Sequence, residues 1–176
     1  MLSIQNDNYQ NEELFINDCI TKNGLQFNPN LNIWNFNDVY SNTTFNFTKL
    51  HISSKILYGI KRTLVWYLEN KSLKHSSNMY SRLKHLFDYF YKANNKEIYD
   101  ISITDLKNYK NSLDKKHIWY LGALSGFLKQ WHAMGYFGLS NEAYDYLNNI
   151  HLKGNQKRSI CFNYGPLQWP FYRLRT

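Results

Sequence analysis

The chain has few cysteines, prolines and glycines, and it has no long apolar run. Its 176 residues include 2 Cys, 3 Pro and 8 Gly. Cys19 and Cys161 are too few for a disulfide scaffold or a cysteine-rich zinc site. No stretch approaches the roughly 18 apolar residues that read as a membrane-spanning helix, and the N-terminus lacks the basic and apolar regions of a signal peptide. We therefore expect a cytoplasmic protein that does not associate with membranes.

The usual signatures of catalysis and of metal binding are missing as well. The 6 His residues show no metal-binding spacing such as His-Glu-x-x-His. Neither a Gly-x-Ser-x-Gly nucleophile motif nor a phosphate-binding Gly-x-x-x-x-Gly-Lys motif occurs. Gly122 and Gly126 fall inside a predicted helix, where they allow close helix packing or the approach of a ligand to the backbone. We expect no catalytic site, no metal and no cofactor.

Apolar and basic residues are plentiful instead. Hydrophobic residues make up 43% of the chain and aromatic residues 18%, which is enough for a stable core in one domain. The formal charge is +8, but residues 1–50 carry 2 basic and 5 acidic residues, and residues 51–176 carry 19 and 8. Such an uneven basic charge favours a polyanionic partner, most simply nucleic acid. The alternative is a surface whose charges only confer solubility.

The hydrophobic pattern changes its period near residue 50. Apolar and polar residues alternate over residues 25–50, which predicts an extended arm with a turn at residues 28–30. Trp34 and Phe36 are expected to dock this arm, residues 1–50, on the rest of the chain. From residue 51 to 151 apolar residues recur every three or four positions, as in helices. Residues 152–176 lose the pattern and are expected to form an irregular linker or tail.

Five helices are predicted from this pattern and from the residues that start and stop helices. The first runs from Ser53 or Ser54 to Asn70, the second begins after Ser76 or Ser77, the third is capped by Thr104, the fourth covers residues 115–133 and stops at Gly135, and the fifth starts at Ser140. Trp119 and Trp131 of the fourth helix are both assigned to the core. The expected fold is all-α, a compact bundle of four to five helices with an N-terminal arm.

Four stretches resemble one known family. Residues 71–83 (KSLKHSSNMYSRL) and 121–132 (LGALSGFLKQWH) are similar to the second and fourth helices of the core-binding domain of tyrosine recombinases, the phage-type integrases. Residues 46–50 (NFTKL) are similar to the segment that precedes its first helix. Residues 135–140 (GYFGLS), followed by 152–155 (LKGN), are similar to the end of that domain and its linker. The resemblance spans about residues 30–167 and implies a SAM-like helical DNA-binding domain.

The resemblance also implies what this chain does not carry. The recombinases cut DNA with a second domain that supplies an Arg, a Lys, a His-x-x-Arg motif and a Tyr nucleophile. His-x-x-Arg does not occur in this sequence, and the residues after Leu167 depart from the start of that domain. Tyr172 has no Arg and His partners to activate it. We therefore expect a chain that is not an enzyme by itself, as a frameshift, a premature stop or a fragment of a longer recombinase would leave it.

In this family the second and fourth helices face the DNA. The resemblance places the candidate DNA contacts on the outer side of the second helix, around the fourth helix and in the linker: Lys74, His75, Asn78, Arg82, His85, Lys115, Lys116, Lys129, Lys153, Lys157 and Arg158. The lysines and arginines would bind phosphates, and Asn78 is the candidate for a base edge. Arg82 could equally be a solvated helix charge, and Asn78 a residue bonded to its own backbone.

The predicted function is thus DNA binding in site-specific integration or recombination. Double-stranded DNA is the expected partner, and further recombinase protomers are candidates because family members assemble cyclically. The alternative is a helical protein-interaction module without DNA-binding function, because a bundle rich in Tyr and Phe also suits a protein partner. An RNA-binding helical protein and an intact enzyme of which this chain is a fragment remain open as well.

Overall fold

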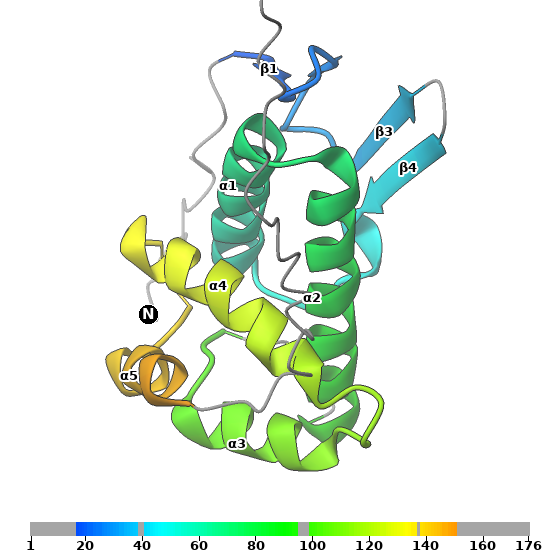
Figure 1. Ribbon diagram of the computed structural model, residues 1–176. Coiled ribbons are helices and arrows are strands. Elements are labelled where there is room, and N and C mark those ends of the chain that lie inside the picture. Colours follow the sequence, from blue (N-terminus) through cyan, green and yellow to red (C-terminus); the bar gives the residue numbers. More distant parts are fainter. Residues whose placement is uncertain (1–16, 39–40, 95–98, 137, 151–176) are drawn as a thin grey trace, which may run out of the picture.

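The computed structural model describes residues 17–38, 41–94, 99–136 and 138–150, and shows a mostly helical protein (Figure 1). Its elements, in chain order, are β1 (Cys19–Ile20), β2 (Gln26–Phe27), β3 (Ile33–Asp38), β4 (Ser41–Asn46), a short 3-10 helix η1 (Phe47–Lys49), α1 (Ser54–Asn70), α2 (Leu73–Asn94), α3 (Ile103–Ser112), α4 (Trp119–Ala133) and α5 (Asn141–Asn149). The five predicted helices are confirmed, but strands accompany them.

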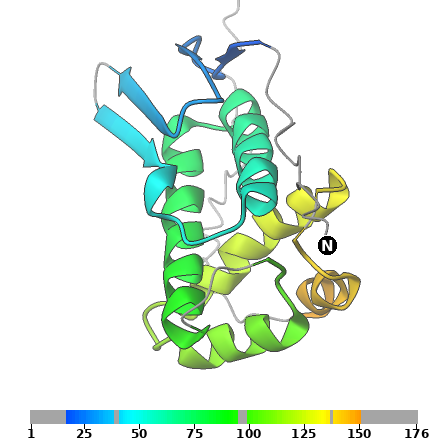
Figure 2. The same cartoon turned by 180° about the vertical axis from the view of Figure 1, so that it is seen from behind.

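The helices form two crossed layers. α1 and α2 run side by side, α4 lies across one face of this pair, and α3 and α5 close one end (Figure 1). Figure 2 shows the opposite face, where the chain crosses from η1 to the start of α1. The fully buried stripe of α1 consists of Ile56, Ile60, Leu64 and Leu68. These residues are spaced by four, so one side of the helix faces the core.

The starts of the first two helices are set by serine caps. The Ser53 hydroxyl accepts a hydrogen bond from the Ile56 amide at 3.4 Å, which confirms the predicted start of α1. The predicted start of α2 after Ser76 or Ser77 is wrong, because α2 begins at Leu73. The Ser72 hydroxyl accepts from the His75 amide at 3.2 Å and takes the capping role four residues earlier. Ser76 is buried inside the helix.

The third helix is also capped by a different residue than predicted. Ser102, not Thr104, is the cap, and its hydroxyl accepts from the Asp105 amide at 3.2 Å. The Asp105 carboxylate in turn accepts from the Ser102 amide at 2.9 Å. This reciprocal pair is a capping box, which satisfies two backbone N–H groups that a helix start otherwise leaves unpaired.

The fourth helix is shorter than predicted, because it begins at Trp119 and not at residue 115. Residues 114–118 form a separate turn, described below. The predicted stop is confirmed: Gly135 follows the helix with a positive φ of 75°, a conformation that glycine adopts without steric cost. Ser140 caps α5, as predicted, by accepting from the Ala143 amide at 3.1 Å. Ala143 and Leu147 of α5 are buried.

The arm before α1 departs from the all-α prediction, because it contains two small antiparallel sheets, β1–β2 and β3–β4. The longer hairpin pairs Ile33 with Asn46 at one end and Asp38 with Ser41 at the other. Its alternating apolar residues share one buried face. Trp34 and Phe36 dock the arm on the core as predicted, and each is only 2% exposed.

Two residues of the helices hold the hairpin in place. Tyr80 of α2 packs against the rings of Phe45 and Phe47, at centroid distances of 5.2 and 5.5 Å, and its hydroxyl bonds the backbone of Asn46. Lys61 of α1 is 6% exposed, and its ammonium donates to backbone and side-chain oxygens of residues 30–32. The hairpin therefore belongs to the same core as the helices.

Candidate nucleic-acid interface

The predicted contact residues of α2 do lie on its outer side. Lys74, Asn78, Arg82 and His85 follow one another at spacings of four and three residues, which keeps them on one side of a helix. Lys74, Asn78 and His85 are exposed and Arg82 is partly buried. The opposite side carries Met79, Leu83, Leu86 and Phe90, all buried. We call this exposed row the α2 stripe.

His75, at the start of α2, joins the stripe to α1. Its imidazole is stacked on the Tyr67 ring, with centroids 5.7 Å apart and planes inclined by 7°. Tyr67 also packs against Phe127 of α4 at 5.3 Å. Burial raises the pKa of the Tyr67 hydroxyl, so this group stays neutral at physiological pH. His75 thus lies where α1, α2 and α4 meet.

Near His75, the outer face of α4 has a glycine and therefore no side chain. Gly126 is exposed, and a Cβ built on it would meet only the Tyr67 hydroxyl, at 3.8 Å. Gly126 therefore does not serve close helix packing, which was one of its two interpretations. The other interpretation of Gly126, that it lets a ligand approach the helix backbone, is consistent with this open surface. Lys129, one turn further on, is partly exposed.

Arg82 and Trp119 form the centre of the candidate site. The guanidinium of Arg82 lies over the indole of Trp119 at 4.4 Å and near the Tyr120 ring at 5.9 Å. A cation over an aromatic face is attracted by the ring quadrupole. Partial burial lowers the pKa of Arg82, an effect that Tyr120 opposes. Arg82 is therefore held in one place, unlike a freely solvated helix charge.

The assignment of Trp119 to the core is wrong. Trp131 is fully buried as predicted, but Trp119 is 38% exposed. The core stripe of α4 contains Leu121, Leu124, Leu128 and Trp131. Residues two positions apart in a helix point about 200° apart, so Trp119 lies on nearly the opposite side from Leu121. The two tryptophans therefore lie on different sides of α4, as the 100° rotation per residue already indicates from the sequence.

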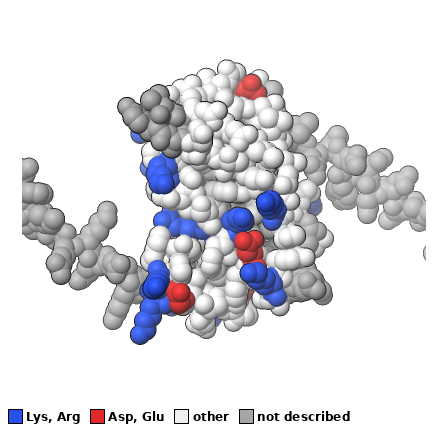
Figure 3. Space-filling model, turned by 90° about the vertical axis from the view of Figure 1, so that its right-hand side faces the viewer, with Lys and Arg blue, Asp and Glu red and all other residues white. Residues whose placement is uncertain are grey.

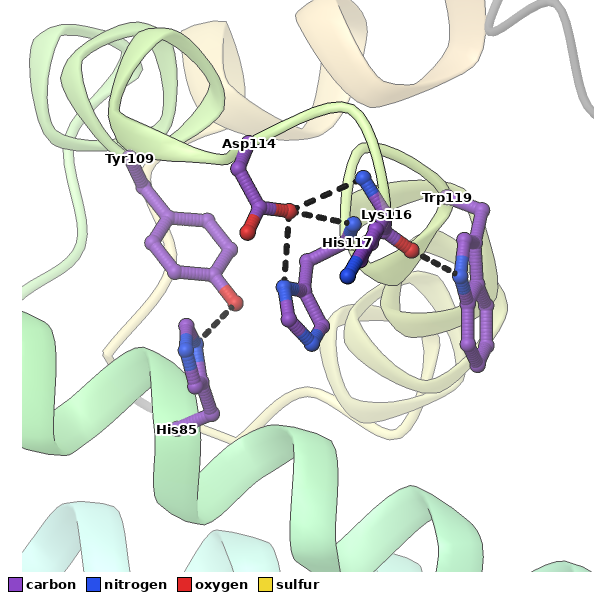
Figure 4. Close-up of polar contacts among 6 residues, drawn as sticks. All are labelled: His85, Tyr109, Asp114, Lys116, His117 and Trp119. Carbon is purple, nitrogen blue, oxygen red and sulfur yellow. Dashed lines mark hydrogen bonds and ion pairs between the residues drawn. The ribbon is translucent and has the colours of Figure 1, made fainter.

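The turn before α4 fixes Trp119 and the backbone of Lys116 (Figure 4). One carboxylate oxygen of Asp114 accepts from the backbone amides of Lys116 and His117, at 2.9 Å each, and lies 2.8 Å from Nδ1 of His117. The indole N–H of Trp119 donates to the Lys116 carbonyl at 2.7 Å. Lys115 and Lys116 are exposed on this turn. Asp114 was not among the predicted site residues, although Asp side chains in turns commonly accept from the backbone amide two residues on, as Asp114 does from Lys116.

Desolvation alone would raise the pKa of Asp114, but the hydrogen bonds from His117 and Lys116 outweigh it. The pKa of this carboxyl is therefore lowered from its ordinary value. The turn consequently keeps a charged acceptor over the whole physiological range. Asp114 therefore has two opposing effects: its hydrogen bonds stabilise the turn, and its negative charge reduces the positive charge of the two neighbouring lysines.

His85 connects the α2 stripe to α3. Its Nδ1 lies 2.9 Å from the hydroxyl of Tyr109, and its ring is 6.1 Å from the stacked ring of His117 (Figure 4). Tyr109 is fully buried, and burial, with a further contribution from Tyr120, raises the pKa of its hydroxyl well above the ordinary value. The hydroxyl is therefore protonated at physiological pH, and its hydrogen bond with Nδ1 of His85 joins α3 to the α2 stripe.

Basic side chains gather on one side of the molecule (Figure 3). Figure 3 views the side of the molecule that lies to the right in Figure 1, and blue Lys and Arg atoms concentrate in its lower half, with two acidic groups among them. The C-terminal half of α2 and the α3–α4 turn occupy this region in Figure 1. The candidate contacts Lys153, Lys157 and Arg158 lie outside the described residues.

Other kinds of site find no support among the residues that the structure describes. No group of three or more His, Cys, Asp or Glu side chains there could hold a metal ion. No helix of that part is long and apolar enough to cross a membrane. No protein-family model, no curated protein and no solved structure matches this chain.

Proposed function

We propose that this chain binds duplex DNA through α2 and α4, as the helical DNA-binding half of a site-specific recombinase does, and that it does not cut DNA by itself. The observation that carries the proposal is the fixed arginine of the α2 stripe. Arg82 stands over Trp119, flanked by the exposed Lys74 on the same helix and by Lys115 and Lys116 on the adjoining turn. Several cations on one side suit the regularly spaced phosphates of a duplex.

The shape of the surface supports the same partner. A helix that approaches DNA closely needs small residues where its backbone meets the ligand, and Gly126 leaves the α4 backbone open beside Lys129. Asn78 lies in the middle of the α2 stripe and is exposed. Its amide can donate to and accept from a base edge, while the neighbouring cations fix the register through phosphates.

The salt dependence of binding tests this function. Five described cations belong to the proposed surface: Lys74, Arg82, Lys115, Lys116 and Lys129. If each neutralises one phosphate, the slope of log K against log salt is about −4.5, and binding weakens a few hundred-fold between about 50 and 200 mM salt. Fluorescence anisotropy of a labelled duplex measures both values.

Single variants locate the interface. Arg82→Ala should lower the affinity and reduce the slope by about 0.9, because one phosphate contact is lost. Lys22→Ala is the matched control, since Lys22 is an exposed cation between β1 and β2, away from α2 and α4. Equal effects of the two variants, or no binding at low salt, would contradict the proposal. Cleavage of a suicide DNA substrate by the purified chain would contradict its non-catalytic part.

A protein-interaction module is the second candidate, and one observation favours it. Ile118 and Trp119 are adjacent and exposed, at 44% and 38%. Exposed large apolar side chains are common at protein interfaces. An apolar interface would be almost insensitive to salt, so the same salt titrations separate the two candidates. Competition with duplex RNA separates DNA binding from RNA binding.

A further inference from the structure

The exposed indole of Trp119 is not explained by the fold or by phosphate binding. It lies on the side of α4 that faces away from the core stripe, and it is 38% exposed. Arg82 can bind a phosphate through its charge alone, and an arginine on a helix needs no aromatic partner for this. Yet Trp119 is held twice, by the hydrogen bond of 2.7 Å to the Lys116 carbonyl and by the guanidinium 4.4 Å away.

We propose that Trp119 is a stacking platform for an unpaired DNA base, with Lys115 and Lys116 binding the phosphates on either side of that nucleotide. This inference rests on the proposed DNA binding and specifies a second mode of contact within it. Proteins that bind unpaired strands combine aromatic rings for the bases with cations that follow the backbone. Both parts are present here within five consecutive residues, 115–119.

The local geometry keeps the platform ready before a ligand arrives. The Asp114 carboxylate fixes the backbone of Lys116 and His117, and that backbone fixes the indole through its N–H group. Tyr120 packs against the indole edge-on at 4.7 Å, and His117 packs against Tyr120 at 4.9 Å. A ring already held in place loses little conformational freedom on binding, so more of the stacking energy appears as affinity.

Stacking does not depend on which base is presented. Every base has a π face, and stacking on a protein ring is therefore tolerant of sequence. A fully paired duplex keeps its bases stacked on each other and offers none to Trp119. The platform would thus recognise a defect in pairing, such as a bulge, a gap or a melted end, next to the duplex that the α2 stripe binds.

The test compares two DNA probes that differ only in pairing. One is a fully paired duplex, and the other is the same duplex with a central bulge of unpaired thymidines. The wild-type chain should bind the bulged probe more tightly, by about 5- to 150-fold, which is the range for stacking one base. Trp119→Ala should remove most of this preference, and Trp119→Phe should keep part of it.

Matched variants distinguish stacking from charge. Lys115→Ala and Lys116→Ala should weaken binding of both probes, because phosphates are present in both. Arg82→Ala should also weaken both probes, and because the guanidinium helps to hold the indole, it should reduce the ratio between probes by less than Trp119→Ala does. Quenching of tryptophan fluorescence by the bulged probe should be larger than by the paired probe, and the difference should vanish in Trp119→Phe. Since Trp119 lies at the surface, circular dichroism should show that its variants fold normally.

The possible outcomes separate the two proposals. If both probes bind equally well and Trp119→Ala weakens them equally, Trp119 only positions Arg82 and the platform is refuted while DNA binding stands. If neither probe binds at low salt, the proposed function itself fails. If the ratio between probes persists in Trp119→Ala, another part of the chain recognises the unpaired bases and the assignment to Trp119 is wrong.

Discussion

Replacing Lys61 by methionine should destabilise the protein although it leaves the hydrophobic stem in place. Lys61 is 6% exposed, and its ammonium donates to the carbonyls of Asn30 and Leu31 at 3.3 and 3.0 Å and to the side-chain oxygen of Asn32 at 3.2 Å. The ammonium also lies 5.3 Å from the centre of the Phe47 ring. A buried lysine is rare unless such partners are present.

The loss of stability in Lys61→Met depends on which of the three acceptor oxygens keep another hydrogen bond. The Leu31 carbonyl still accepts from the Trp34 indole at 2.9 Å, so it stays hydrogen-bonded in the variant. The other two oxygens lose a charged donor, a bond that contributes about 1.5–3 kcal/mol each. Relief from burying the ammonium offsets part of this. We expect the free energy of unfolding to fall by about 2–3 kcal/mol, a large share of the 5–15 kcal/mol typical of a domain.

Urea denaturation followed by circular dichroism measures this change. Lys74→Met is the control, because it makes the same change of charge at an exposed position and should alter stability by less than about 0.5 kcal/mol. Hydrogen exchange should show the greatest loss of protection in β3 and β4. If Lys61→Met costs no more than Lys74→Met, the hydrogen bonds only balance the cost of burial, and the lysine does not anchor the hairpin.

Three further predictions concern the turn, a cap and the core. Protection of the Lys116 amide should depend on the charge of Asp114. Because the pKa of this carboxyl is lowered in the folded chain, its stabilisation is fully present above about pH 4 and is lost as the pH falls through the lowered pKa. Asp114→Asn should abolish this pH dependence in NMR-detected hydrogen exchange. Ser102→Ala should cost about 1 kcal/mol in urea denaturation by removing the cap of α3; an unchanged midpoint would argue against the capping box. Gly59→Ala should destabilise by about 1–3 kcal/mol despite the better helix propensity of alanine, because a Cβ would lie 2.9 Å from that of Tyr136 and press on the indole of Trp131; a raised melting temperature would refute the clash.

The helices could be predicted from the sequence because several local signals agreed. The stripe from Ile56 to Leu68, the cap at Ser53 and the stop at Gly135 each depend on neighbouring residues only. At the third helix, where Ser102 and Thr104 are both candidate caps, the prediction chose the wrong residue. Ser102 is the cap in preference to Thr104 because Asp105 lies three residues after Ser102 and can return the hydrogen bond.

The hairpin and the centre of the site were harder to predict, because they depend on contacts between distant residues. Alternation showed that residues 25–50 are extended, but pairing of β3 with β4 requires a register that no single strand contains. Arg82 and the lysines were identified from charge and from the resemblance. Their relation to Trp119 was missed, because α4 begins at residue 119 and brings that indole to α2 only in the folded chain.

α2 carries the hairpin and the proposed DNA surface on different sides. Tyr80 packs against the strands, and Arg82, two residues later, points about 200° away from it around the helix. A chain shortened to begin at Ser53 would lose Phe45 and Phe47 and leave the Tyr80 ring in water. The arm is therefore not a module that can be exchanged between proteins while the helices stay the same. Sequence changes in the hairpin and in the proposed DNA surface have to be compatible with each other, because both depend on the position of α2.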